Sequence, residues 1–361
     1  MARRGTSRQR VTINDVAEAA GVSRSTTSRA LTGRGYVAKD VRERVHSAAR
    51  ELGYVPDALA RSLKQRHSPV IGVLVSDLSN PFYAELAAGA ARRAREKNLG
   101  VMLADTAGES DAERSAAELF VSMRVAGVLV TPVGPKVVEY LAEAQVPTVE
   151  VDRYFAPRLA DSVTVSNVAG AMGMTDHLLR LGHRDIVMLI DETGWTTGRD
   201  RVEGFRRAHA AHGLTLDDSN VVSTGWSSRD TAIAATSVMA RPERPTAIFT
   251  TNNVLAEGAW RAIHEAGLRI PEDVSLCTFD EAPWMTMVTP EITAVSQDAH
   301  QLGEAAATLL LDRMSDPDRA PRSVELGTTL LQRASVGVVP DRDRRTDTGL
   351  GAGSRAPSHR L

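Results

Sequence analysis

Polar side chains that could hold a small ligand recur just after short apolar runs of this 361-residue chain. Apolar runs that alternate with helical patterns are typical of parallel strands covered by helices on both faces. Ligands of such sheets bind beyond the carboxyl ends of the strands, so these side chains are expected to converge on one cleft. Their hydroxyl, amide and carboxylate groups suit a neutral polyol, a sugar or a nucleoside-like ligand. The residues that this rule selects are Ser76, Asp77, Asn80, Thr131, Asp152, Ser166, Asn167, Asn252, Asn253 and Asp280.

A second chemistry, the recognition of DNA, is indicated by residues 12–33, TINDVAEAAGVSRSTTSRALTG. Thr12 is placed to cap one short helix, Gly21 to end it, and Ser23 to cap a second helix over 24–31. Two short helices joined by a tight turn predict a helix-turn-helix, whose second helix enters the major groove.

The outer side of that second helix carries the residue types that contact bases and phosphates. Ser25 and Ser28 are short enough to let the helix approach the base edges. Arg24 could donate two hydrogen bonds to a guanine, and Arg29 could do the same or hold a phosphate. The alternative interpretation is a solvated helical hairpin in a small α-domain.

The charge distribution favours DNA binding. Residues 1–66 carry 14 Lys/Arg and 6 Asp/Glu, a formal charge of +8, whereas the remainder carries 29 and 39, a formal charge of −10. This asymmetry indicates a basic nucleic-acid module on an acidic, soluble body. Residues 1–11 are expected to be a disordered basic arm rather than a signal peptide, and no stretch approaches the ~18 apolar residues of a membrane span. The single cysteine, Cys277, excludes an intramolecular disulfide framework, is expected to be buried, and fits a cytoplasmic, nucleoid-associated protein.

Two further segments follow the basic helices. Residues 41–56 have the apolar stripe of a third amphipathic helix. In residues 57–67, Asp57 is a plausible cap for a helix too short to be stable alone, and Leu63 resembles the wedges that minor-groove binders insert between base steps. An ordinary interdomain linker is the alternative interpretation of this segment.

The rest of the chain predicts an α/β core with two parallel, doubly wound sheets, one in each lobe. Residues 162–167, SVTVSN, are expected to open the second series of strands, and the segment around 290–298 to cross back. The predicted organisation is a headpiece over 12–56, a hinge over 57–67, a core over 68–340 with lobe 1 at about 68–163 and 296–325 and lobe 2 at about 164–292 and 326–340, and a disordered tail over 341–361.

Motifs for catalysis and for cofactors are missing from the sequence. It contains no glycine-rich phosphate cradle and no nucleophile elbow. His209 and His212 have a spacing that a metal site allows, but a solvated helical face is the simpler interpretation. We therefore expect no enzyme activity, no cofactor and no metal.

Several of these segments resemble the LacI/GalR family of bacterial transcription regulators over about residues 11–340. The resemblance rests on TINDVAEAAGVSRSTTSRAL (12–31), RERV (42–45), LGYVPDALARSL (52–63), IGVLVSDLSNPFY (71–83), LGHRDI (181–186), DRVEGF (200–205), TNNVLAEGAWRAI (251–263) and TFDE (278–281). It implies a homodimer on a pseudo-palindromic operator, a hinge helix at residues 58–64 whose Leu63 opens the central base step, and a core related to periplasmic sugar-binding proteins.

The resemblance also implies roles for individual residues. Arg201 matches an effector-binding arginine, Asn252 and Asp280 the groups that grip ligand hydroxyls, and Trp226 an aromatic that packs on the ligand. The effector-binding set is Ser76, Asp77, Asn80, Phe82, Asp152, Arg201, Trp226, Asn252, Asp280 and Gln297. The DNA-binding set is Thr12, Ser23, Arg24, Ser25, Thr26, Ser28, Arg29, Arg34, Tyr54, Ala60, Leu63 and Lys64.

Departures from the family pattern leave the identity of the ligand undetermined. Asn253 stands where the family often has an acid, Ala299 where some sugar binders carry an aromatic, and Ala38 where a serine caps the third helix. Trp195 has no family counterpart and is expected either to close over the ligand or to sit on a surface loop.

The expected mechanism is a coupling between the lobes and the two hinges of a dimer. It predicts a transcription regulator, a repressor, whose affinity for operator DNA is switched by a sugar or a related metabolite. The alternatives are a solute-binding or sugar-modifying core fused to a DNA-binding module, and a structural DNA-bending protein.

Overall fold

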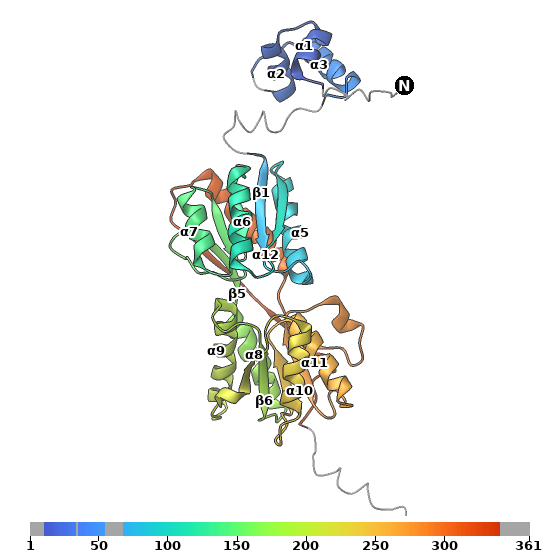
Figure 1. Ribbon diagram of the computed structural model, residues 1–361, viewed down its shortest axis with the longest axis vertical. Helices are drawn as coiled ribbons and strands as arrows, with labels where there is room; N and C mark the ends of the chain where they lie inside the picture. The colour runs from blue at the N-terminus through green and yellow to red at the C-terminus, as the bar shows by residue number, and fades with distance from the viewer. Residues whose placement is uncertain (1–10, 34, 55–67, 340–361) are drawn as a thin grey trace, which may run out of the picture. The chain divides into compact units, whose positions relative to one another are not determined.

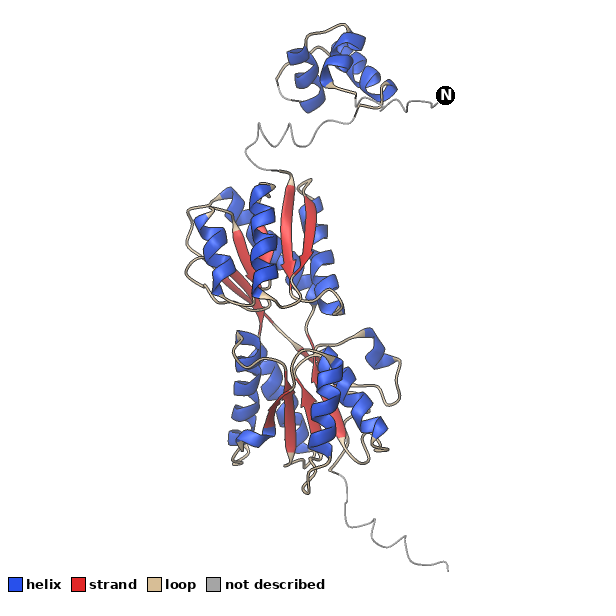
Figure 2. Ribbon diagram, in the orientation of Figure 1, coloured by secondary structure: helices blue, strands red, loops and turns tan. Residues whose placement is uncertain are grey.

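The computed structural model describes residues 11–33, 35–54 and 68–339 and divides into two compact units, Met1–Pro69 and Val70–Leu361. Figure 1 labels the elements of both units, and Figure 2 shows that the first is helical whereas the second combines helices with strands. The predicted hinge at 57–67 and tail at 341–361 lie outside the described residues, as does the predicted arm up to residue 10. No helix of the described part is long and apolar enough to cross a membrane.

The first unit is the predicted helix-turn-helix. Thr12 caps the first helix through a capping box, since its hydroxyl accepts from the Asp15 backbone N–H at 3.4 Å and its own N–H donates to the Asp15 carboxylate at 2.7 Å. Gly21 ends that helix at φ 63°, a left-handed conformation that glycine adopts without strain. Ser23 caps the second helix by accepting from Thr26 N–H at 3.2 Å. The helices are α1 (Ile13–Ala20), α2 (Arg24–Thr32) and α3 (Lys39–Glu51).

The third helix differs from its prediction at both ends. The interpretation of 41–56 as one helix is wrong at its C-terminal end, because α3 stops at Glu51 and Gly53 turns the chain at φ 63°. Ala38 provides no side-chain cap, as expected. Apolar side chains of all three helices and of Val37, which precedes α3, form one small core: Val16, Ala20, Ala30, Val37, Val45, Ala48 and Ala49.

Lobe 1 of the second unit is a six-stranded sheet in the order β11-β5-β4-β3-β1-β2. Every pairing in it is parallel. On one face α5 packs against α12, and α6 and α7 cover the other. Its strands are β1 (Val70–Val75), β2 (Gly100–Asp105), β3 (Val128–Val130), β4 (Thr148–Val151), β5 (Asp161–Val165) and β11 (Ser323–Leu326), and its helices are α5 (Pro81–Arg95), α6 (Ser110–Ser122), α7 (Pro135–Glu143) and α12 (Ala299–Ser315).

Strand β1 shows why this sheet needs helices on both faces. Its side chains alternate, so Ile71, Val73 and Val75 join the cluster that includes α5 and α12, whereas Leu74 joins the cluster of α6 and α7. A Cβ atom at Gly72 would lie 2.3 Å from the Phe120 ring of α6, so a glycine is required where the helix approaches the strand.

Lobe 2 is a six-stranded sheet in the order β12-β10-β9-β8-β6-β7, in which only β12 is antiparallel to its neighbour. Helix α8 packs against α9, and α10 against α11. Cys277 is buried in strand β9, as expected, and burial raises the pKa of its thiol. The elements are α8 (Asn167–Arg180), β6 (Ile186–Ile190), α9 (Thr196–Ala211), η1 (Asp218–Asn220), β7 (Val221–Ser223), α10 (Ser228–Met239), β8 (Ala247–Thr250), α11 (Asn253–Glu265), β9 (Ser275–Phe279), η2 (Pro283–Thr286), β10 (Thr293–Ser296) and β12 (Thr329–Leu331).

The interpretation of 162–167 as the opening of the second lobe is wrong. Strand β5 pairs with β4 and β11, so it belongs to the first sheet. The chain passes between the lobes after β5, after β10 and after β11. The sequence misplaced β5 because a short apolar strand looks the same at the end of one sheet as at the start of the next.

Candidate effector pocket and nucleic-acid interface

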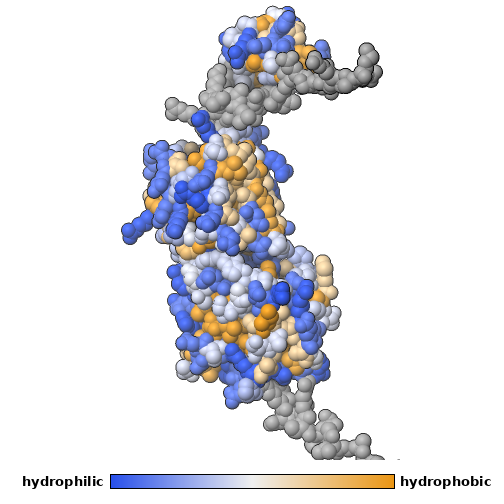
Figure 3. All heavy atoms as spheres, viewed as in Figure 1, coloured by the Kyte–Doolittle hydropathy of each residue, from blue (hydrophilic) through white to orange (hydrophobic). Residues whose placement is uncertain are grey.

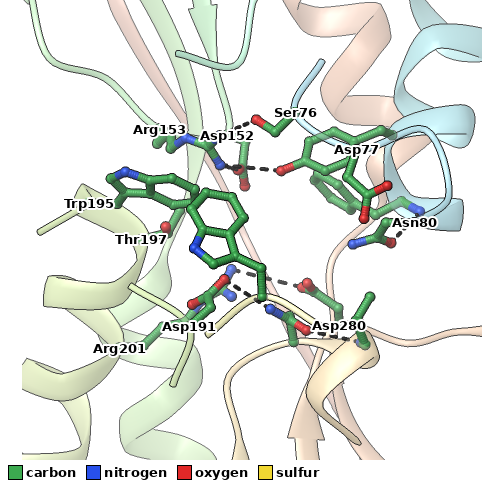
Figure 4. Close-up of a pocket in the computed structure, with 15 residues that line it drawn as sticks. Ser76, Asp77, Asn80, Asp152, Arg153, Asp191, Trp195, Thr197, Arg201 and Asp280 are labelled. Atoms are coloured by element: carbon green, nitrogen blue, oxygen red, sulfur yellow. Dashed lines mark hydrogen bonds and ion pairs between the residues drawn. The ribbon is translucent and has the colours of Figure 1, made fainter. Parts of the chain in front are cut away.

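A small pocket lies between the two lobes of the core, at the carboxyl ends of their strands (Figure 4). Lobe 1 contributes residues that follow β1 and β4, and lobe 2 contributes residues that follow β6, β7, β8 and β9. The cavity has a volume of about 50 Å³. Its lining is Ser76, Asp77, Asn80, Phe82, Tyr83, Asp152, Arg153, Asp191, Trp195, Thr197, Arg201, Trp226, Asn252, Val254 and Asp280.

Arg153 forms the polar wall on the lobe 1 side. It is 2% exposed, and it donates to Pro132 O at 2.6 Å, to the Tyr83 hydroxyl at 3.2 Å and to the Ser76 hydroxyl. The adjacent Asp152 carboxylate accepts from Arg153 Nη1 at 3.3 Å. Burial raises the pKa of Asp152, and the charges of Arg153 and Arg201 oppose that rise.

Arg201 and Asp280 form the facing wall in lobe 2. Arg201 projects from α9, lies over the Phe279 ring at 3.8 Å and donates to Asn167 Oδ1 at 2.8 Å and to the Thr251 carbonyl. Its Nη2 lies 3.9 Å from Asp280 Oδ1, a longer separation than a hydrogen bond. Burial raises the pKa of Asp280 to about 6, against the opposing charge of Arg201.

Gln297 supports this wall from behind. Its amide Nε2 donates to Asp280 Oδ1, whereas its Oε1 is buried without a hydrogen-bond partner among the described residues. A buried acceptor without a donor is unfavourable. Gln297 itself does not line the cavity, although it contacts Asp280, which does.

Asn252 has a structural task in addition to its place in the pocket. Its Oδ1 caps α11 by accepting from Val254 N–H and Leu255 N–H, both at 2.9 Å. Its Nδ2 donates to Asp191 Oδ2 at 3.0 Å, which holds that carboxylate in the pocket.

Two indole rings close the pocket. Trp195 and Trp226 meet edge to face with centroids 4.2 Å apart, and the Arg153 guanidinium lies 3.8 Å from the Trp195 ring centroid. Trp195 is 8% exposed, so the surface-loop alternative for it is wrong.

Polar contacts also join the lobes directly. Asn253 Nδ2 donates to Asn80 Oδ1 at 2.9 Å, and Tyr154 N–H donates to Thr196 Oγ1 at 3.3 Å. Asn253, where the family often has an acid, therefore does more than remove a charge, because its side chain is buried and bridges the lobes.

Most of the residues selected from the sequence lie in this pocket, but not all. Thr131 is buried in lobe 1 and exchanges a hydrogen bond with Ser76 at 3.2 Å, and Asn167 positions Arg201 rather than lining the cavity. The cavity is also not lined by Ser166, Asn253 or Gln297. Four lining residues were not predicted from the sequence: Tyr83, Arg153, Asp191 and Thr197. Asp191 directly follows β6 (Ile186–Ile190), so its signal is the polar residue at the end of an apolar run.

The outer face of α2 carries the predicted DNA contacts. Arg24, Ser25 and Arg29 are exposed, whereas Thr27 is fully buried beneath them, which the sequence analysis did not foresee. Tyr54 packs partly against the headpiece core, and Thr12 and Ser23 are exposed caps. The predicted contacts Arg34, Ala60, Leu63 and Lys64 lie outside the described residues.

The interpretation of His209 and His212 as a solvated helical face is wrong for His209, which is 2% exposed and packs edge to face on the Phe205 ring. His209 Nδ1 donates to Phe205 O at 2.9 Å, and His212 Nε2 lies 2.8 Å from Asp176 Oδ1. The part of the chain that the structure describes holds no cluster of three metal-binding side chains.

A helix-turn-helix unit followed by a two-lobed α/β core with a polar interlobe pocket defines a class of protein, the DNA-binding regulators that respond to a small ligand. Residues 12–57 match the model of bacterial regulatory proteins of the lacI family, and residues 175–336 match that of the periplasmic binding protein-like domain. The chain is 32% identical to the ribose operon repressor of Escherichia coli over 330 residues, which cover 90% of this chain and 99% of that protein. It therefore belongs to the LacI family of transcriptional regulators.

Solved structures agree with this assignment. The lac repressor dimer bound to operator and an anti-inducer has a TM-score of 0.82 and 26% identity, covering 91% of this chain and 100% of that one. A LacI-family regulator from Enterococcus faecium with bound ribose has a TM-score of 0.68 and 28% identity, covering 74% and 99%.

Proposed function

We propose that this protein is a dimeric repressor that binds operator DNA and responds to a neutral sugar held between the lobes of its core. The observation that supports the effector most directly is the buried Arg201–Asp280 wall with the unpartnered Gln297 Oε1 beside it. A sugar hydroxyl can accept from Arg201 and donate to Asp280 or Gln297 at once. A relative that is a ribose operon repressor and a family structure with bound ribose make a pentose the first candidate.

The charge of the lining favours an uncharged ligand. Four carboxylates line the pocket against two guanidinium groups, Arg153 and Arg201. The buried Arg153 already donates to Pro132 O, Tyr83 and Ser76, so it has little capacity left for an added anion. A phosphorylated sugar would bring more negative charge to this excess of carboxylates, and like charges repel strongly at low dielectric.

Specific roles follow for the predicted effector contacts. Arg201, Asp280, Gln297 and Asn252 hold hydroxyls from lobe 2, and Asp152 holds them from lobe 1. The remaining members of the proposed set, Ser76, Asp77, Asn80, Phe82 and Trp226, shape and cover the pocket.

The headpiece contacts are proposed in two groups. Arg24, Ser25, Ser28 and Arg29 face the base edges and nearby phosphates of the major groove. Thr12, Ser23, Thr26 and Tyr54 hold the phosphate backbone from the helix starts and from the end of α3. Outside the described residues, Arg34 is proposed to hold phosphates, and Ala60, Leu63 and Lys64 to contact the minor groove.

An apolar surface of lobe 1 supports the dimer. Strand β2 is an edge strand, and Leu103 on it, with Leu78 in the loop after β1 and Leu119 and Met123 near the end of α6, leaves large apolar area exposed. Figure 3 shows orange, apolar surface over lobe 1 beside a hydrophilic region. Contiguous apolar surface of this kind is typical of protein–protein contacts.

The proposal also includes a coupling between the effector pocket and the DNA-binding headpiece. A ligand that favours one arrangement of the lobes changes the spacing of two hinges in a dimer, and ~1–3 kcal/mol of coupling is sufficient for a switch. We propose regulation in the cytoplasm and no catalysis. Three of the pocket carboxylates, those of Asp152, Asp191 and Asp280, are engaged with arginine or amide side chains. The fourth, Asp77, accepts from the backbone N–H and the hydroxyl of Ser79 two residues further on, as in a local turn.

Thermal-shift measurements on the purified protein test the effector class. D-ribose, other monosaccharides, sugar phosphates and nucleosides are compared, since a ligand raises the melting temperature by mass action. The proposal expects a shift with a neutral sugar and a changed affinity for operator DNA at the same concentration. Stabilisation by sugar phosphates alone would refute it.

A further inference from the structure

Two buried carboxylates of lobe 1 lie outside the effector pocket. Glu113 on α6 is 3% exposed and Glu150 on β4 is fully buried, and neither lines the cavity. Among the residues that the structure describes, both carboxylates accept hydrogen bonds from backbone N–H groups alone. Burial raises the pKa of each to about 7. A buried carboxylate is unfavourable unless its hydrogen bonds are needed, so both positions indicate a specific task.

Glu150 holds the segment that carries the lobe 1 wall of the pocket. Its Oε1 accepts from Phe155 N–H at 2.7 Å and from Ala156 N–H at 3.2 Å, just after Asp152 and Arg153. The backbone of Asp152 has φ 70°, a left-handed conformation that is uncommon outside glycine. Strained backbone persists only where its surroundings hold it, and the Glu150 carboxylate provides such a hold.

Glu113 holds a second support of the same wall, the peptide unit between Pro132 and Val133. Its Oε1 accepts from Val133 N–H at 2.9 Å, and the Pro132 carbonyl of that unit accepts from Arg153 Nε at 2.6 Å. Because a peptide unit is planar, fixing its N–H also fixes the direction of its C=O. The charge of Arg153 acts back on Glu113 by lowering its pKa, against the larger effect of burial.

Both supports therefore act on Arg153, which does line the cavity. Arg153 is 2% exposed, and its guanidinium contacts the Asp152 carboxylate at 3.3 Å and the Trp195 ring centroid at 3.8 Å. Figure 4 shows these three side chains together at the pocket. A displacement of Arg153 would thus change the positions of an acceptor and of an aromatic ring at once.

We propose that Glu113 and Glu150 are positioning residues of the effector pocket, which act on the bound sugar through Arg153. Glu150 fixes residues 152–156, and Glu113 fixes the peptide unit to which Arg153 donates. This inference rests on the proposed function of the pocket. It makes effector affinity depend on the reach of the two side chains to their backbone donors rather than on their charge.

Calorimetric titration of the full chain with D-ribose, D-xylose and D-glucose at pH 8, above the pKa of about 7 of both carboxyl groups, tests the inference. Glu113→Gln and Glu150→Gln keep an acceptor oxygen at the same reach, so they should bind the sugar within about 3-fold of the wild type. Glu113→Asp and Glu150→Asp keep the carboxylate but withdraw it by one methylene. They should bind about 10-fold more weakly or worse, as sites do when their supporting hydrogen bonds are lost.

Asp161→Asn is the matched control for loss of stability. Asp161 is another fully buried carboxylate of lobe 1, but it lies at the amino end of β5 and holds Arg313 and Arg319. Its substitution should lower the melting temperature and leave the affinity of the folded protein for the sugar unchanged. A loss of affinity equal to that of Glu150→Asp would assign all the losses to destabilisation and overturn the inference.

Operator binding without sugar gives a second measure of the same variants. The headpiece belongs to a separate compact unit, so all four variants should bind operator DNA as the wild type does. A loss of operator affinity that parallels the loss of sugar affinity would contradict a role confined to the pocket.

The outcomes separate this inference from the proposed function. If the wild type binds one of the sugars and the Asp variants bind it equally well, or the Gln variants lose as much affinity as the Asp variants, the inference is wrong and the proposed function stands. Because the two residues act on Arg153 from different elements, one folded Asp variant is sufficient for the test. Failure of both to fold would show a role in stability alone and overturn the inference. If the wild type binds none of the three sugars, both are refuted.

Discussion

Replacing Arg201 by alanine should affect the stability of the core and its response to the effector in separable ways. Arg201 Nη2 lies 3.9 Å from Asp280 Oδ1, and both side chains are less than a tenth exposed. At this distance and an effective dielectric constant of about 20, the attraction between the charges is about 4 kcal/mol. Removal of one partner of a buried pair destabilises by about 3–5 kcal/mol, because the other charge is left uncompensated.

This loss should depend on pH. Burial raises the pKa of Asp280 to about 6 in the folded protein, against 3.8 for the free side chain. Above pH 6 the carboxylate is ionised, and the wild type gains the full attraction that Arg201→Ala lacks. Below pH 6 Asp280 is protonated in both folded proteins, so the difference in the free energy of unfolding should shrink to the lost hydrogen bonds with Asn167 and Thr251.

Urea unfolding of both proteins at pH 5 and pH 8, together with operator binding with and without effector, checks these expectations. Arg199→Ala, on the same helix but with an exposed side chain, is the matched control and should change the stability by less than about 1 kcal/mol. Arg201→Ala should keep its DNA affinity and lose its response to ligand. A response at the same ligand concentration, or a loss of stability equal at both pH values, would refute the assignment of Arg201 and Asp280.

Four other predictions concern the pocket and the headpiece. Effector affinity of the wild type should fall as the pH drops through about 6, since protonated Asp280 accepts hydrogen bonds less well, whereas Asp280→Asn should bind weakly at every pH in the same titration. Ribose 5-phosphate should bind at least tenfold more weakly than ribose by calorimetry; equal affinities would contradict the charge balance of the lining. Arg24→Ala should change the preferred operator bases in a binding selection, by about 1–3 kcal/mol of discrimination, and an unchanged preference would reassign Arg24 to the phosphates. Leu63→Ala should weaken operator binding but spare non-specific binding in gel-shift assays, and equal loss of both would exclude the wedge.

The headpiece was predicted well because its signals are local. Thr12, Gly21 and Ser23 act within a few residues of their own positions, so their spacing alone predicts the caps and the turn that the structure contains. The end of α3 was placed too late, since a continuing amphipathic pattern outweighed the turn at Gly53.

The pocket was predicted in part for a similar reason. Strand ends are visible as the last apolar residue of a run, and the polar residues there, such as Asp152 and Asp280, were found by that rule. Arg153 was not predicted as a pocket residue, and Trp195 was left with two alternative interpretations. An arginine after a strand is usually solvated, and only the contacts with Tyr83, Pro132 and the indole show that it is a buried wall.

The sequence by itself determined the helix-turn-helix, the alternation of strands and helices, and the family of the chain, because each depends on residues close together along the chain. The tertiary structure alone decided that β5 completes the first sheet, that Asn253 joins the lobes through Asn80, and that two tryptophans 31 positions apart share one pocket. The first depends on which strands pair, the second on how the two lobes approach each other, and the third on how two loops of lobe 2 meet. Each joins residues far apart along the chain, and no periodicity or local spacing encodes such a contact.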